Sequence, residues 1–115
     1  MINIGIIGFG FVGSSVAYGF SPQTGFDKAK LRIYDKNPAK STHGLKEVLD
    51  ESDFIFLSVP TPSNVDGSIN LTILESVLDE VNTHGTKDGC IVLVRSTVVP
   101  GTTRVLQKKY NQKLL

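Results

Sequence analysis

The chain has 115 residues, of which 40% are hydrophobic and 20% charged, and its 12 Lys and Arg against 11 Asp and Glu leave a formal net charge of +1. This length indicates one small domain, and the near balance of charge argues against a nucleic-acid groove or a polybasic membrane surface, both of which need a basic excess. There is no run of about 18 apolar residues to span a membrane, and a single cysteine excludes an internal disulfide, so we expect a reducing, cytoplasmic setting.

The first predicted element is a strand over residues 2–8, INIGIIG, which is short, rich in isoleucine and apolar on both faces. This pattern is typical of a strand that is covered on both sides, as in a parallel sheet. The apolar start differs from a signal peptide because it lacks a basic beginning and a cleavage site and is interrupted by glycines. A helix is predicted to follow from Phe11 to Phe20.

Strands and helices continue to alternate along the rest of the chain. The helix over residues 71–83 has the clearest apolar period, with Asn70 as the expected N-cap and Gly85 just after its end. The other predicted elements are strands over 30–35, 53–60 and 90–96, a short helix over 44–52, and a last helix over 101–115 with Leu114 near its apolar face.

This order predicts an α/β fold, a Rossmann-type parallel sheet of about four strands with flanking helices and right-handed crossovers. Such sheets bind ligands at the carboxyl ends of their strands, so four segments are expected on one rim. They are residues 8–13 (GFGFVG), 35–40 (DKNPAK), 59–63 (VPTPS) and 95–103 (RSTVVPGTT). The unpaired edges of so small a sheet, and a last helix without a stop signal, favour either a missing C-terminal remainder or a homo-oligomer.

Residues 8–13 form a GxGxxG motif between a predicted strand and a predicted helix, which is the context that a dinucleotide-binding motif requires. Gly8 permits a tight turn, Gly10 lets a pyrophosphate approach the backbone, and Gly13 lets the helix pack close to the sheet. Phe11 and Val12 open the helix, whose free N–H groups and positive dipole end suit phosphates. The alternative is a glycine-rich turn that holds no ligand.

Asp35 closes the second strand 22 positions after Gly13, where a carboxylate can accept hydrogen bonds from the ribose hydroxyls of adenosine. It would repel a 2′-phosphate, which favours NAD over NADP, although the neighbouring Lys36 can neutralise such a phosphate. A solvated turn aspartate is the alternative. The two prolines of residues 59–63 fit an extended loop beside the cofactor and fit a plain connection equally well.

Taken together, GFGFVG, Asp35 with Lys40 five positions on, SDFIFLSVPTPSNVDGSINL and VRSTVVPGTT resemble the NAD-binding domain of the UDP-glucose/GDP-mannose dehydrogenase family, over residues 2 to about 110. The resemblance implies NAD as cofactor, with its adenosine beside Asp35 and Lys40 and its nicotinamide near Ser96 and Thr97. Whether Thr97 also orders a water or proton path stays open. The cofactor-binding residues expected on this basis are Gly8, Gly10, Phe11, Val12, Gly13, Asp35, Lys40, Val59, Pro60, Thr61, Pro62, Ser63, Ser96 and Thr97.

In the resembled family, a CH–OH group of a nucleotide sugar is oxidised to a carboxylate by two successive hydride transfers, through a thioester-type intermediate on a cysteine of a later, sugar-binding domain. That domain has no counterpart in residues 1–115. The resemblance therefore implies an NAD-binding domain, truncated on its C-terminal side, that binds NAD but does not turn over. A nucleotide sugar would be a partner only together with the second domain.

No catalytic or metal-binding residue is expected in this chain. Cys90 begins a strand on the rim opposite the glycines and has no basic partner nearby in sequence, so a buried structural thiol is favoured over a nucleophile. His43 lies in a polar loop and His84 beside a helix end, and neither has a second ligand at metal-binding spacing.

Two other functions stay open. The segment between the second and third strands is shorter than is usual in the resembled family and is similar to that of β-hydroxyacid dehydrogenases, which favours a reductase of that class. The second alternative is a stand-alone nucleotide-binding module, which would need a stable fold without further domains.

Overall fold

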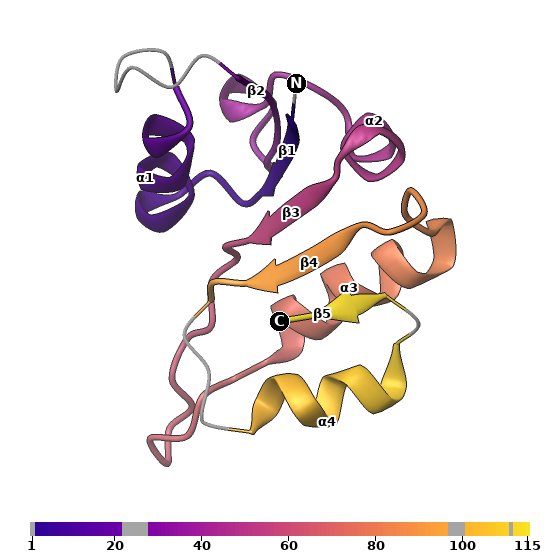
Figure 1. Ribbon diagram of the computed structural model, residues 1–115. Helices are drawn as coiled ribbons and strands as arrows, with labels where there is room; N and C mark the ends of the chain where they lie inside the picture. Colours follow the sequence, from indigo (N-terminus) through magenta and orange to yellow (C-terminus); the bar gives the residue numbers. More distant parts are fainter. Residues whose placement is uncertain (1, 22–27, 97–100, 111) are drawn as a thin grey trace.

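Strands and helices alternate along the chain in the computed structural model, which describes residues 2–21, 28–96, 101–110 and 112–115 (Figure 1). The strands are β1 (Ile2–Ile7), β2 (Ala29–Tyr34), β3 (Phe54–Leu57), β4 (Ile91–Val94) and β5 (Lys113–Leu114). The helices are α1 (Phe11–Gly19), α2 (Leu45–Glu51), α3 (Thr72–His84) and α4 (Thr102–Lys109), and the 3-10 turn η2 (Pro38–Lys40) follows β2.

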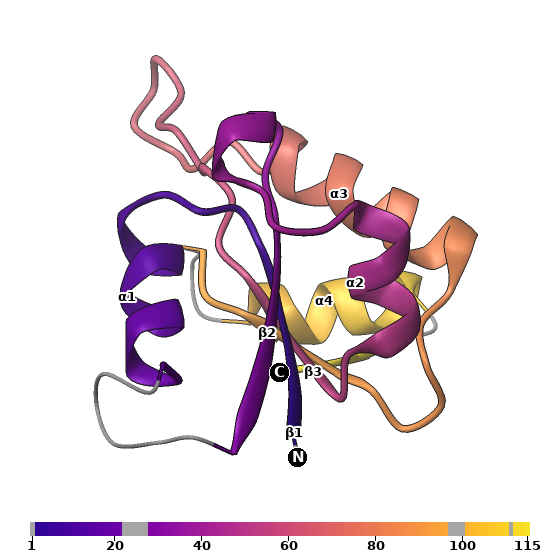
Figure 2. The ribbon, with the colours of Figure 1, turned by 90° about the horizontal axis from the view of Figure 1, so that it is seen from above.

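The five strands form one parallel sheet in the order β2-β1-β3-β4-β5. β1 lies inside the sheet, because Ile4 pairs with Leu31 of β2 on one side and with Phe54 of β3 on the other. Seen from above, α1 lies on one side of the sheet, whereas α2, α3 and α4 lie on the other (Figure 2). The predicted fold class, a Rossmann-type parallel sheet with flanking helices, is therefore confirmed, with five strands where about four were expected.

Two apolar cores lie on the two faces of the sheet, which explains why the sequence of β1 is apolar at nearly every position. On the α1 side, Ile4 and Ile6 of β1 pack with Ala17 of α1 and Ile33 of β2. The opposite core is larger. Its buried side chains are Ile7, Val48, Leu49, Ile55, Leu57, Val59, Leu74, Leu78, Val81, Cys90, Val92, Leu106, Tyr110 and Leu114.

The predicted helix over 71–83 is confirmed as α3, although its N-cap is Leu71 and not the expected Asn70. Asn70 precedes it, and its side-chain oxygen accepts the backbone N–H of Thr72 at 2.9 Å. Gly85 ends the helix at a φ of 86°, and its N–H donates to the carbonyl of Val81. Within the described part of the chain, no helix is long and apolar enough to cross a membrane.

The last predicted helix is wrong in its second half. α4 ends at Lys109, and residues 113–114 form β5, which pairs in parallel with β4. The side chain of Gln107 explains the change, because its Nε2 donates to the carbonyl of Gln112 at 2.7 Å and its Oε1 accepts the N–H of Leu114 at 2.8 Å. Leu114 is buried, but in the sheet and not on a helix face.

Candidate cofactor site

The first four strands end at a common edge of the sheet. Ile7 of β1 is the register partner of both Tyr34 of β2 and Leu57 of β3, and Leu57 is the partner of Val94 of β4. These four residues are the last of their strands. The segments that follow them therefore leave the sheet side by side, as the prediction of one shared rim requires.

Gly8 makes the turn out of β1. Its φ is 95°, a conformation that other residues rarely adopt. Its N–H donates to the carbonyl of Tyr34 at 2.9 Å, and a Cβ atom placed on it would lie 2.6 Å from the carbonyl oxygen of Ser58. Both the backbone angle and the neighbouring chain thus demand glycine here.

The other two glycines of the motif differ in what surrounds them. A Cβ atom on Gly13 would run into the carbonyl oxygen of Gly8, so α1 packs against the end of β1 as closely as a missing side chain allows. A Cβ atom on Gly10 would meet nothing within 4 Å. Gly13 is therefore needed for packing, whereas Gly10 keeps space free in front of the helix.

The start of α1 suits an anion. Phe11 and Val12 lie in its first turn, which carries no acidic residue, and Gly10 precedes it without a side-chain cap. The N–H groups at such a helix start lack partners inside the helix, and the helix dipole is positive there. The free space at Gly10 and this helix start together fit a pyrophosphate.

Asp35 joins the end of β2 to the glycine loop. Its Oδ2 accepts the N–H of Phe9 at 2.7 Å and its Oδ1 accepts the N–H of Asn37 at 2.8 Å. The hydrogen bonds from Asn37 and Phe9 and the charge of Lys40 lower the pKa of Asp35 below its usual value, although partial burial acts in the opposite direction. The carboxylate is thus ionised and held in place at the rim.

Lys40 stands at the end of η2 and is exposed. Asn37 caps this turn, since its side-chain oxygen accepts the N–H of Ala39 at 3.0 Å. A hollow of about 430 Å³ opens between η2 and the start of α2. Its lining includes Asp35, Lys36, Pro38 and His43.

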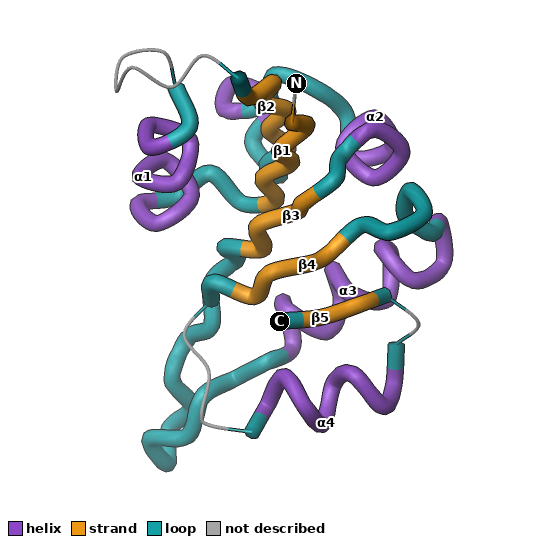
Figure 3. Tube along the Cα trace, in the orientation of Figure 1, coloured by secondary structure: helices purple, strands orange, loops and turns teal. Residues whose placement is uncertain are grey.

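The segment after β3 is partly fixed by the core and partly by a hairpin. Val59 is buried, whereas Pro60 and Pro62 are exposed and Thr61 is half-buried. Ser63 pairs with Ile69 in an isolated antiparallel bridge. Figure 3 shows this segment as the long loop between β3 and α3, which extends away from the sheet.

Ser96 ties the fourth segment to the third. Its hydroxyl donates to the carbonyl of Val59 at 2.7 Å, and its N–H donates to the carbonyl of Leu57 at 3.1 Å. Thr97 lies outside the described residues. The structure thus brings Gly8, Gly10, Gly13, Asp35, Val59 and Ser96 to one rim, with Lys40 at its outer side.

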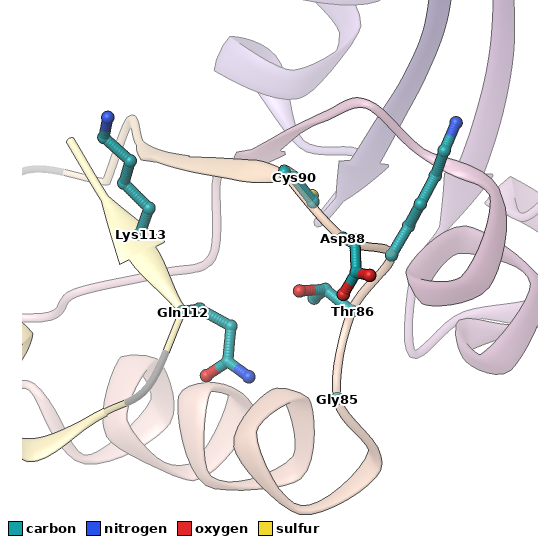
Figure 4. Close-up of a pocket in the computed structure, with 8 residues that line it drawn as sticks. Gly85, Thr86, Asp88, Cys90, Gln112 and Lys113 are labelled. Carbon is teal, nitrogen blue, oxygen red and sulfur yellow. The ribbon is translucent and has the colours of Figure 1, made fainter.

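A second hollow, of about 380 Å³, lies at the opposite edge of the sheet (Figure 4). Thr86, Asp88, Cys90, Gln112 and Lys113 surround it in the close-up. Cys90 is buried, and burial together with the charge of Asp53 raises the pKa of its thiol to about 11. The predicted burial of this thiol is confirmed, and a buried thiol with a raised pKa is a poor nucleophile.

Neither histidine lies in a metal-binding group. Nδ1 of His43 is 2.8 Å from Oγ1 of Thr42, and Nε2 of His84 is 2.9 Å from a carboxylate oxygen of Asp50. Among the residues that the structure describes, no three histidine, cysteine or acidic side chains gather around a point that a metal ion could take.

Two features of the rim were missing from the sequence reasoning. The carbonyl of Ser58 forms the wall against which Gly8 turns, and Ser41 bonds the backbone of Asp35. No short motif announces either contact, because each depends on which strands become neighbours.

Residues 23–114 match the UDP-glucose/GDP-mannose dehydrogenase family, NAD binding domain. The chain therefore belongs to this family, as its NAD-binding domain.

Individual relatives agree with this assignment. The chain is 30% identical over 130 residues to the UDP-glucose 6-dehydrogenase AglM of Haloferax volcanii, an alignment that covers 89% of the chain and 30% of AglM. The fold matches a UDP-glucose dehydrogenase of Pyrobaculum islandicum (TM-score 0.72, 24% identity, 99% of this chain and 34% of that one). It also matches a GDP-mannose dehydrogenase of Pseudomonas aeruginosa (TM-score 0.73, 24% identity, 96% and 33%). The chain spans less than a third of the length of the curated relatives that it matches.

Proposed function

We propose that this chain binds NAD across the rim formed by the first four strands. The observation that carries the proposal is the geometry of the glycine loop. Gly8 and Gly13 are required by the fold, whereas Gly10 borders open space at the start of a helix that has no acidic residue in its first turn. Open space at this helix start is what the close approach of a pyrophosphate to the backbone requires.

The remaining rim residues fit the rest of the cofactor. The carboxylate of Asp35 keeps acceptor capacity for the adenosine ribose, since each of its oxygens has two lone pairs and accepts one backbone hydrogen bond, from Phe9 or from Asn37. Lys40 is expected on the outer side of the adenosine, Val59 to Ser63 beside the cofactor, and Ser96 and Thr97 near the nicotinamide. When bound, NAD would supply the hydride acceptor.

The reaction proposed for the complete site is oxidation of the C6 alcohol of a nucleotide sugar to a carboxylate. Two NAD molecules each accept one hydride, and water supplies the second carboxylate oxygen. The family membership supports this proposal, and one relative, AglM, carries the name UDP-glucose 6-dehydrogenase. Cys90 does not suit the role of the nucleophile, because it is buried at the opposite edge of the sheet. We expect residues 1–115 to bind NAD but not to oxidise a sugar without a second, sugar-binding domain.

A direct binding measurement tests the proposal. The chain has no tryptophan, so its intrinsic fluorescence comes from tyrosine. When NADH is titrated into the folded chain, we expect saturable quenching of this fluorescence and a shift of NADH emission. NAD should compete with NADH for binding. Mixing the chain with NAD and UDP-glucose should produce no NADH. A folded sample that binds neither NAD nor NADH would refute the cofactor proposal, and NADH production would refute the dependence on a second domain.

The second candidate is a β-hydroxyacid dehydrogenase-like reductase. The short crossover favours it, because only η2 and the seven-residue helix α2 lie between β2 and β3. Both candidates predict NAD binding by this chain. They differ in the polypeptide that completes the site, since only the nucleotide-sugar enzyme depends on a cysteine. Sensitivity of the complete enzyme to a thiol-alkylating reagent, with protection by UDP-glucose, would favour the first candidate.

A further inference from the structure

The outer edge of β2 is closed by backbone and side-chain groups of residues 41–43 instead of a further strand. β2 lies at the end of the strand order β2-β1-β3-β4-β5, so one of its edges has no neighbouring strand. There the N–H of Ile33 donates to Oγ1 of Thr42 at 2.9 Å. The carbonyl of Ile33 accepts the N–H groups of Thr42 and His43 at 2.9 and 3.0 Å. Residues 41–43 therefore take the place that a pairing strand would take.

Ser41 continues this pattern at Asp35. The N–H of Asp35 donates to Oγ of Ser41 at 2.8 Å, and the same hydroxyl donates to the carbonyl of Asp35 at 2.9 Å. One side chain thus holds both polar groups of the Asp35 backbone. Because the Asp35 carboxylate accepts N–H groups from Phe9 and Asn37, the residue is fixed at its backbone and at its side chain.

The short connection between β2 and α2 brings Ser41 within hydrogen-bonding distance of Asp35. η2 begins three residues after Asp35 and turns the chain back, so that Ser41 returns to the residue that ended β2. Ser41 and Asp35 also line the same hollow of about 430 Å³. The hydroxyl of Ser41 therefore bonds the backbone of Asp35, and the carboxylate of Asp35 accepts the N–H of Phe9 in the glycine loop.

We propose that Ser41 is a positioning residue for the adenosine end of the cofactor, because its hydroxyl fixes the backbone of Asp35 and thereby the direction of the carboxylate. The inference rests on the proposed binding of NAD. Two neighbouring ribose hydroxyls need both carboxylate oxygens at set positions, so a backbone that can shift should weaken binding even though Asp35 itself is intact.

Two variants test the role, and each removes one hydroxyl acceptor from a backbone N–H, either in β2 or just after its end. Ser41→Ala removes the acceptor at Asp35, and Thr42→Val removes the acceptor at Ile33 without touching Asp35. Both should lower the urea midpoint. We expect NADH to bind roughly fivefold more weakly to Ser41→Ala, the effect of one lost hydrogen bond, and within twofold of wild type to Thr42→Val.

Rescue and a double-mutant cycle separate positioning from a general effect on stability. Ser41→Thr keeps a hydroxyl and should bind NADH within twofold of wild type. In an Asp35→Asn background, Ser41→Ala should weaken binding less than it does alone, because the group it positions has already lost its charge. Equal losses of affinity in Ser41→Ala and Thr42→Val, or fully additive effects in the cycle, would overturn the inference.

The controls distinguish this inference from the proposed function. A wild-type chain that is folded but does not bind NADH refutes the proposed function. If the wild type binds NADH and Ser41→Ala binds it with equal affinity, the positioning role is refuted and the proposed function is not. Circular dichroism checks folding, and if Ser41→Ala does not fold, Ser41→Cys carries the same expectation, because its thiol is a much weaker acceptor.

Discussion

The backbone N–H of Phe9 donates to Oδ2 of Asp35 at 2.7 Å, so a charged group joins the glycine loop to the end of β2. At the opposite edge of the sheet, the N–H of Asn3 donates to Oδ2 of Asp53 at 2.9 Å. The two ends of the sheet are thus held by the same kind of bond, a carboxylate that accepts a backbone N–H of the β1 region. This similarity makes the two aspartates natural controls for each other.

Replacing Asp35 should affect both stability and binding, whereas replacing Asp53 should affect stability alone. Asp35→Ala removes the acceptor for Phe9 and Asn37, which should lower the free energy of unfolding by about 1–2 kcal/mol and weaken NADH binding at least tenfold. Asp53→Ala should also destabilise the fold but leave NADH affinity within twofold of wild type. Urea denaturation and NADH titration measure the two effects. Equal affinities of the two variants would contradict the placement of the site.

The glycines of the loop should separate packing from binding. Gly13→Ala drives a methyl group into the carbonyl oxygen of Gly8, and overpacking of this kind should lower the free energy of unfolding by about 2–3 kcal/mol. Gly10→Ala places a methyl group in open space, so the urea midpoint should stay close to that of wild type while NADH binding weakens. A Gly10→Ala chain with unchanged affinity would show that the pyrophosphate does not approach there.

Acid should destabilise the fold between about pH 4 and pH 2. Hydrogen bonds from Lys87 and from Asn3 lower the pKa of Asp53 from 3.8 to about 2. Since its pKa is lower in the folded state, Asp53 stabilises the fold above the unfolded pKa, and this contribution is lost as the pH falls through the folded pKa. Urea midpoints measured from pH 6 to pH 2 should fall less steeply below pH 4 in Asp53→Asn than in wild type.

The same titration has an internal check. Asp35 and Asp66 also have lowered pKa values, so Asp53→Asn should keep part of the acid dependence. Lys87 and Asp53 are partly exposed, and added salt should therefore reduce the difference between wild type and variant. Acid curves that coincide at low salt would contradict a role of the Lys87 pair.

The thiol of Cys90 should be inert in the folded chain. Its pKa is raised to about 11 by burial and by the nearby charge of Asp53, so only about one thiol in ten thousand is a thiolate at pH 7. A chromogenic disulfide reagent should label it slowly in buffer and at once in concentrated urea. Rapid labelling of the native chain, at a rate that urea does not increase, would contradict the buried position.

The parts of the fold that the sequence predicted are those with long or strongly patterned segments. The apolar run of β1 and the spacing of Leu74, Leu78 and Val81 in α3 each allow one structure. The end of the chain does not, because the helical pattern of Leu106, Tyr110 and Leu114 suits a helix as well as a helix followed by a strand. The choice between them depends on the edge of β4, which is distant in sequence, and on two hydrogen bonds of the Gln107 side chain, which no apolar pattern indicates.

The candidate site was predictable to the extent that the strand order fixes it. Once β1, β2, β3 and β4 are parallel neighbours, the glycine loop, Asp35, Val59 and Ser96 must share a rim. The contacts of Ser41 and Ser58 within the rim were not predictable, because they depend on which segments become neighbours in the folded chain. Ser58 acts through its backbone and Ser41 through a bond to a strand edge, and neither leaves a pattern in the sequence.

The central place of β1 also sets the order in which the protein can fold. β1 pairs with β2, but its other neighbour is β3, and Asn3 meets Asp53 across 50 residues of chain. On the ribosome, at about 5–20 residues per second, the first strand must therefore wait roughly 3–10 s for this second neighbour to be synthesised. Ile4 and Ile6 share their core with Phe54 and Phe56 of β3, so they stay incompletely covered during that interval. Apolar surface that is exposed during synthesis is prone to aggregate.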